Sequence, residues 1–136
     1  KIMKGEAPAD IYYEDDHAIA FLDANPANVG HTLVIPKKHF ETIDKMNKIE
    51  LDKLSEAILK ISKGIMTIAD GMNIIQNNKE VAGQAVPHVH FHLVPRYKGD
   101  GYSLGWKREK KITKKENNEF LKKLKEVKIW KKSFKD

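Results

Sequence analysis

The sequence contains no cysteine among its 136 residues. Neither a disulfide framework nor a thiolate metal site can therefore be built from these residues, and we expect a cytoplasmic protein. No apolar run approaches the roughly 20 residues that cross a bilayer, and residues 1–10 lack the apolar centre of a signal peptide. We therefore expect no membrane partner.

Aromatic residues are also few, at 8%, while 40% of the residues are hydrophobic and 32% are charged. These proportions are ordinary for a globular protein with one core, which excludes disorder of the whole chain. The length fits a single domain of about 100 to 150 residues. We expect one functional site.

The net charge of +6 is spread unevenly along the chain. Residues 1–104 carry 12 Lys and Arg against 14 Asp and Glu, whereas residues 105–136 carry 13 against 5. A lysine-rich helix is more often a solvated face than a site for polyanions. We expect no specific nucleic-acid partner and treat residues 105–136 as a basic segment packed on the domain formed by residues 1–104.

Short runs rich in β-forming residues open the chain and return after its middle. The strands predicted from them span residues 11–13, 18–22, 32–35, 72–76 and 87–94, the last ended by Pro95. Between residues 50 and 69 the apolar residues recur every three or four positions and stop before Gly71, which predicts a helix. Thr113 and Glu116 form a capping-box pattern, which predicts a second helix from Lys114. The predicted fold class is α+β, with about five antiparallel strands.

Three histidines, His88, His90 and His92, alternate with apolar residues in the last predicted strand. In a strand they share one face, about 6.6 Å apart, while the apolar residues share the other. A neutral imidazole can act as a nucleophile, and a protonated neighbour can donate to a phosphoryl oxygen. The spacing suits an anionic group. The rival interpretation is a zinc or copper site, against which no carboxylate lies near in sequence, although one could come from elsewhere in the fold.

Residues 88–94 resemble the His-φ-His-φ-His-φ-φ signature of the histidine triad (HIT) superfamily, in which φ is hydrophobic. Other segments are similar to the family pattern in the same order, and the similarity spans residues 1–104. These segments are residues 2–8, 13–15, 20–23 and 30–39, Asn77, and Gly83-Gln84. The branch most similar is the bacterial-type and nucleotide-binding one. The resemblance implies a HIT-like fold, a purine nucleotide ligand and a homodimer.

The resemblance assigns the chemistry to four histidines. His90 matches the nucleophile that attacks an α-phosphate, and His92 matches a donor to a phosphoryl oxygen. His88 and His31 would orient the nucleophile. The implied function is hydrolysis of a purine nucleoside 5′-monophosphate derivative of the phosphoramidate type, without a required cofactor. The alternatives are dinucleoside polyphosphate hydrolysis and a nucleotide-binding regulator with little turnover.

The resemblance also implies a set of nucleotide-binding residues. Asp23 would bind the ribose hydroxyls, and Phe21 and Ile2 would line the base pocket, although core packing explains those two equally well. Asn77 would contact the phosphate or sugar, or serve as a turn residue. Gly83 and Gln84 complete the set.

Two departures from the family pattern concern the leaving group and zinc. Ala85 stands where phosphoramidases commonly carry a hydroxyl residue, and alanine has no proton to give. Many members hold a structural zinc through an upstream Cys-x-x-Cys and histidines that match His39 and His88. Zinc is expected here only if such a motif precedes residue 1.

Dimerisation is also predicted from the long helix. Its additional apolar residues, Ala57, Leu59 and Met66, widen the apolar stripe beyond what one sheet needs to cover.

Overall fold

The computed structural model describes residues 10–105 and 111–128, so Ile2 lies outside the described part. The chain divides into two compact units, one ending at Tyr102 and one beginning at Ser103. We describe each unit by itself. The packing of the basic segment on the first unit stays a prediction.

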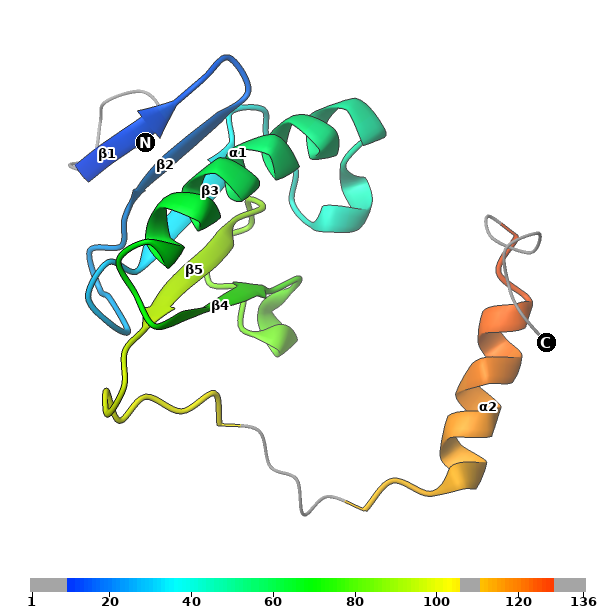
Figure 1. Cartoon of the computed structure of the whole chain (residues 1–136). Coiled ribbons are helices and arrows are strands. Elements are labelled where there is room, and N and C mark those ends of the chain that lie inside the picture. Colours follow the sequence, from blue (N-terminus) through cyan, green and yellow to red (C-terminus); the bar gives the residue numbers. More distant parts are fainter. Residues whose placement is uncertain (1–9, 106–110, 129–136) are drawn as a thin grey trace. The chain divides into compact units, whose positions relative to one another are not determined.

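The first unit is built on one five-stranded sheet (Figure 1). The strands are β1 (Asp10–Glu14), β2 (Ala18–Leu22), β3 (Thr32–Pro36), β4 (Gly71–Gln76) and β5 (Phe91–Arg96). Their order in the sheet is β1-β2-β3-β5-β4, and every neighbouring pair is antiparallel. The α+β class and the antiparallel sheet are therefore confirmed.

Helix α1 (Lys48–Met66) lies across one face of this sheet (Figure 1). Asn47 caps it, because its side-chain oxygen accepts the backbone N–H of Glu50 at 2.8 Å. The predicted end at Ala69 is wrong. Thr67 N–H and Thr67 Oγ1 both donate to the carbonyl of Gly64, which closes the last turn early.

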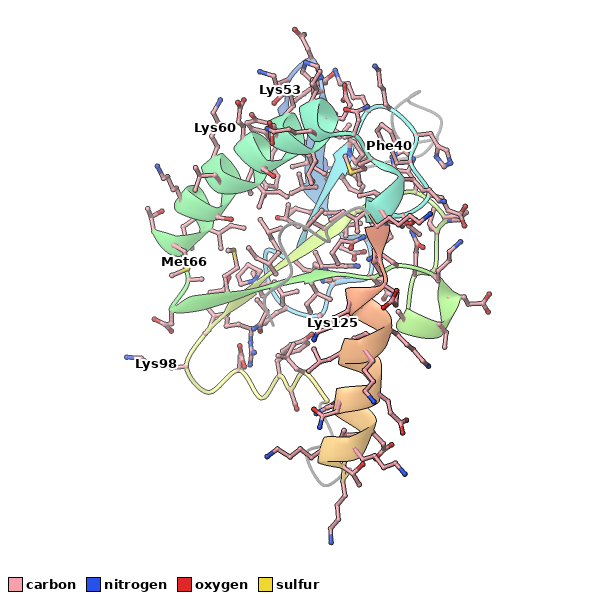
Figure 2. All side chains as sticks on the ribbon, turned by 90° about the vertical axis from the view of Figure 1, so that its right-hand side faces the viewer. Phe40, Lys53, Lys60, Met66, Lys98 and Lys125 are labelled. Carbon is pink, nitrogen blue, oxygen red and sulfur yellow. The ribbon has the colours of Figure 1, made fainter. Side chains whose placement is uncertain are left out.

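The core lies between α1 and the sheet. Its buried residues are Ala18, Ala20, Val34, Leu54, Ala57, Ile61, Val89 and Leu93. Ala57 belongs to this core and adds nothing to an outer apolar stripe, so that part of the dimer argument is wrong. Leu59 and Met66 are exposed by 57% and 50%, and Figure 2 shows Met66 at the end of the helix.

Strand β5 begins four residues later than predicted, because residues 87–90 lie outside the sheet. Val34 pairs with Phe91, and the same register would place Pro36 opposite Val89. Proline has no N–H to donate, so the ladder stops there. Val89 N–H donates instead to the carbonyl of Phe40 at 2.7 Å.

Strand β5 also continues through Pro95, which was predicted to end it. Pro95 pairs with Met72 of β4, whereas pairing with β3 ends at Leu93 opposite Thr32. On the β3 side the strand is therefore an edge at this point. A proline is tolerated there because no ladder hydrogen bond requires its N–H.

The second unit contains α2 (Lys114–Lys125). The predicted capping box is confirmed, since Glu116 N–H donates to Thr113 Oγ1 at 3.1 Å and Thr113 N–H donates to the Glu116 carboxylate at 2.9 Å. Figure 2 shows Lys125 in its last turn. Neither helix in the described part of the chain is long and apolar enough to cross a membrane.

We predict that Leu54→Ala lowers the free energy of unfolding by about 2 to 5 kcal/mol, because it opens a cavity in the core. Leu59→Ala on the same helix is the matched control, and we expect a change within about 0.5 kcal/mol because this leucine is mostly exposed. Urea unfolding measures both. Equal losses would contradict the placement of the core.

Candidate active site

The candidate site lies on the face of the sheet opposite α1. Phe21 pairs with Leu33, and Leu33 pairs with His92, so one row of side chains crosses three strands. Val34 and Leu93, the next residues along the chain, belong to the core under α1. Because side chains alternate along a strand, His92 and Leu33 face away from the helix. Phe21 lies in the same row and is 5% exposed.

Asp23 and His31 lie beyond this row, directly after the end of β2 and directly before the start of β3. Asp23 N–H donates to the carbonyl of His31 at 2.8 Å. The Asp23 carboxylate lies 3.5 Å from His31 Nε2. The structure therefore brings together Phe21, Asp23, His31 and His92, four residues that the sequence analysis assigned to one site.

The backbone selects the tautomer of His31. Ala27 N–H donates to His31 Nδ1 at 2.9 Å, so this nitrogen is an acceptor and the neutral ring carries its proton on Nε2. Burial lowers the pKa of His31, and the Asp23 carboxylate opposes that shift. The ring is therefore neutral near pH 7.

His31 passes this selection on to His92. His31 Nε2 lies 3.0 Å from His92 Nδ1, and since His31 carries its proton there it must donate. His92 then keeps its proton on Nε2. Burial, followed by the neighbouring His90 and His31, lowers the pKa of His92. A neutral His92 in this tautomer still presents an N–H donor, so donation does not require the protonated neighbour that the sequence analysis assumed.

His90 has the opposite tautomer. Its Nδ1 lies 2.7 Å from the carbonyl oxygen of His88, which can only accept, so Nδ1 carries the proton. Nε2 of the neutral ring is left with a lone pair. The rings of His90 and His92 are 5.0 Å apart and nearly perpendicular. The site thus places one nitrogen lone pair beside one N–H donor.

His88 points to a different partner. Its Nε2 donates to the carbonyl of Pro36 at 2.9 Å, and its Nδ1 lies 3.1 Å from His39 Nδ1. Burial lowers the pKa of His88. The three histidines therefore do not converge on one anionic group, as their spacing had suggested.

The His39–His88 pair fits two ligands of a tetrahedral zinc ion. Nitrogens bound to one zinc at about 2.0 to 2.1 Å lie about 3.3 Å apart. The bond from His88 to a backbone carbonyl is the usual orienting contact for a zinc-bound imidazole. The sequence supplies no cysteine for the remaining positions.

A second group with metal-ligand chemistry consists of Asp23, His31 and His92, whose ligand atoms lie within 4.8 Å of one another. His88 and His90 are not part of it. The nitrogens of His31 and His92 that face each other are already joined by a hydrogen bond, which a metal would have to replace.

A loop from Asn77 to Gln84 lies beside His90. Gln76 pairs with Phe91, so the next residue, Asn77, follows on toward His90. The side-chain amide of Asn77 has no hydrogen-bond partner among the residues that the structure describes, so it could bind a ligand. Gly83 has φ +96°, a left-handed conformation that favours glycine over residues with a side chain.

Gln84 holds this loop in place with its buried side chain. Its Oε1 accepts Lys79 N–H at 2.7 Å, and its Nε2 donates to the carbonyl of Glu41 at 2.7 Å. Both ends of the amide are therefore engaged within the protein. Lys79 itself has φ +76° and ψ 156°, a conformation that side chains disfavour, and the Gln84 contact stabilises it.

Sequence reasoning missed the role of Ala27, which acts only through its backbone N–H. Alanine carries no chemical signal for such a role, and only the loop conformation reveals it. Residues Arg96 and Asp100 were also missed. Their spacing of four residues suits an ion pair, but it gives no link to the histidines.

Fold and site together define a protein with a histidine-based site on one face of a small antiparallel sheet. The HIT domain matches residues 4–99, and the chain belongs to the HIT family. It is 53% identical over 102 residues to an uncharacterized HIT-like protein of Methanocaldococcus jannaschii, covering 74% of this chain and 79% of that protein.

Two further comparisons bear on structure and activity. An adenosine 5′-monophosphoramidase of Schizosaccharomyces pombe is 36% identical over 107 residues, which cover 78% of this chain and 79% of that enzyme. A solved protein of Streptococcus mutans has a TM-score of 0.80 and 37% identity, covering 91% of this chain and 80% of that one.

We predict that Gln84→Ala lowers the free energy of unfolding by about 1 to 3 kcal/mol, because it leaves buried hydrogen-bond groups without a partner. It also leaves Lys79 N–H without its acceptor, so amide exchange at Lys79 should become faster. Glu80→Ala, an exposed position in the same loop, is the control. Unchanged exchange at Lys79 would show that Gln84 does not hold the loop.

Proposed function

We propose that this protein hydrolyses a purine nucleoside 5′-monophosphate derivative of the phosphoramidate type through a covalent nucleotidyl intermediate on His90. One observation carries the proposal. Fixed backbone acceptors and donors give His90 and His92 opposite tautomers, so a nucleophilic lone pair stands beside a hydrogen-bond donor.

In the first step, His90 Nε2 attacks the α-phosphorus. A phosphorus–nitrogen bond to His90 forms, and the bond to the leaving amine breaks. The ring then carries a positive charge, which is stabilised by the hydrogen bond from its Nδ1–H to the carbonyl of His88. His92 Nε2–H donates to a phosphoryl oxygen as charge builds there. Ala85 is exposed, so the amine takes its proton from water.

In the second step, water attacks the phosphorus and His90 leaves. The product is the nucleoside monophosphate, and the proton from the water passes to solvent. His90 returns to the neutral tautomer because the carbonyl of His88 still binds its Nδ1–H. Two displacements invert the phosphorus twice, so the stereochemistry is retained.

The other residues around the histidines suit the nucleoside part of the substrate. Asp23 presents carboxylate oxygens, which can accept both ribose hydroxyls. Phe21 lies on the same face and offers an apolar wall. The side-chain amide of Asn77 supplies a polar contact to the phosphate or sugar. The name of the Schizosaccharomyces pombe relative, an adenosine 5′-monophosphoramidase, supports this substrate class.

We predict that His90→Ala lowers kcat by about 10⁴-fold or more while nucleotide binding persists, because only the attacking atom is removed. His92→Ala should cost less, about 10²- to 10³-fold, since it removes one donor. His17→Ala is the matched control, because His17 contacts Glu50 on α1 and lies outside the site. Single-turnover kinetics with a nucleoside phosphoramidate and a dinucleoside polyphosphate measures these effects.

The stereochemical outcome and a chelator separate this mechanism from attack by a metal-bound water. In isotopically labelled water, a chiral α-phosphorothioate substrate should give a product with retained configuration, and EDTA should leave turnover unchanged. Net inversion, or full activity in His90→Ala, would contradict the covalent role of His90. A wild-type protein that binds nucleotide without turnover would favour the regulator instead.

We also propose a homodimer, formed through the edge strand β4 and the outer side of α1. Ile74 of β4 is 49% exposed, and Leu59 and Met66 are exposed on the helix that precedes this strand. Within the described residues β4 pairs only with β5, so its other edge can pair with a second copy.

We predict that Ile74→Lys shifts the protein toward monomer in sedimentation velocity at micromolar concentration, because a charge would be buried between the copies. Val81→Lys, at a side chain that is 99% exposed, is the control and should leave the dimer intact. A wild-type protein that is already monomeric at these concentrations would remove the proposal.

A further inference from the structure

The loop between β2 and β3, residues 23–31, is fastened to the end of β5 by Asn28. Asn28 Nδ2 donates to the carbonyl of Pro95 at 3.1 Å and to the Asp100 carboxylate at 2.9 Å. Within the loop, the carbonyl of Asn28 accepts His31 N–H at 3.1 Å. One side chain therefore ties the loop to a residue 72 positions away.

Asp100 is a strong anchor because it accepts several hydrogen bonds at once. Arg96 donates to it through Nε at 2.9 Å and through Nη2 at 3.0 Å. The backbone N–H groups of Tyr97 and Tyr102 donate at 2.9 Å and 3.0 Å. The Arg96 guanidinium, together with these N–H groups, holds the pKa of Asp100 well below its usual range.

Arg96 is in turn fixed on the sheet. It donates to the side-chain oxygen of Asn73 on β4 at 2.8 Å and to the carbonyl of Tyr102 at 2.7 Å. Its guanidinium also lies 4.5 Å from the centre of the Tyr102 ring. The Arg96–Asp100 pair is therefore attached to β4 and to β5, the strand that also carries His92.

The fastened loop supplies the N–H that selects the histidine tautomers. Ala27, directly before Asn28, donates to His31 Nδ1, and His31 donates to His92 Nδ1. We propose that Asn28 and Asp100 are positioning residues for His92. By holding Ala27 N–H on His31, they keep the proton of His92 on Nε2, where the substrate would meet it.

The alternative tautomer shows what the clamp prevents. If the loop moved and Ala27 N–H turned to water, the His31 proton could shift to Nδ1. His31 Nε2 would then be an acceptor, and His92 would have to donate to it from Nδ1. His92 would face the substrate with a lone pair in place of an N–H, and the donor to the phosphoryl oxygen would be lost. The catalytic consequence rests on the proposed function, whereas the tautomers can be observed without it.

The test is long-range proton–nitrogen NMR of the histidine rings at pH 8, above the ordinary histidine pKa of about 6.5. In the wild type we expect the proton on Nε2 of both His31 and His92. In Asn28→Ala and Asp100→Asn we expect a mixture of tautomers at both rings. Tyr12→Phe is the matched control, because it removes one hydrogen bond to Thr32, next to His31, and leaves the loop in place.

The kinetic readout separates positioning from general weakening of the fold. We expect kcat to fall about 10- to 100-fold in Asn28→Ala and Asp100→Asn, with KM within about twofold, because a donor used in the transition state is lost. Tyr12→Phe should keep wild-type kcat. An equal kcat loss in Tyr12→Phe would overturn the assignment.

Two outcomes distinguish this inference from the proposed function. Shifted tautomers in the two clamp variants, together with a wild type that never hydrolyses phosphoramidates, would support the clamp and contradict the enzyme. Unchanged tautomers in both clamp variants would overturn the clamp, whatever the activity. If both variants fail to fold, Ala27→Pro removes the donating N–H itself, and unchanged tautomers in that variant would overturn the proposal equally.

Discussion

The structure depends on the way Val89 and Leu93 are buried beneath α1. These two residues are fully buried in the core, and this places His90 and His92 on the opposite face. A slip of one residue in this segment would exchange the two sets, putting imidazoles under the helix and apolar groups in the site. The free energy of burying the core therefore also fixes where the chemistry can occur.

A second layer of control comes from backbone groups. A carbonyl can only accept and an N–H can only donate, so each backbone contact assigns one ring nitrogen without ambiguity. The carbonyls of Pro36 and His88 determine the tautomers of His88 and His90, and Ala27 N–H determines that of His31. Unlike an imidazole ring, a peptide group cannot exchange its donor and its acceptor. These assignments therefore persist as long as the loops keep their positions.

Much of the fold could be predicted because periodicity and capping are local. The alternation of Val89 and Leu93 with the histidines, and the Thr113–Glu116 capping box, needed no tertiary information. The errors arose where another segment decides the outcome. Pro36, far away in sequence, determines where β5 begins, and the start of β3 at Thr32 determines that Pro95 is tolerated.

The site divides in the same way. The family resemblance placed Asp23, Phe21, His31 and His92 in one site, and the structure brings them to one face. The resemblance could not show that both ends of the Gln84 side-chain amide make hydrogen bonds within the protein, or that Asn28 contacts Asp100. Those contacts depend on loop conformations, which leave no periodic pattern in a sequence.

The backbone of Lys79 has a consequence for how the loop beside His90 moves. Its conformation is one that almost only glycine adopts without cost, and a lysine there stores about 1 to 3 kcal/mol. That energy is released when the loop detaches, so opening costs less here than in an unstrained turn of the same contacts. Gln84 therefore holds the loop beside His90 closed against a backbone conformation that favours opening.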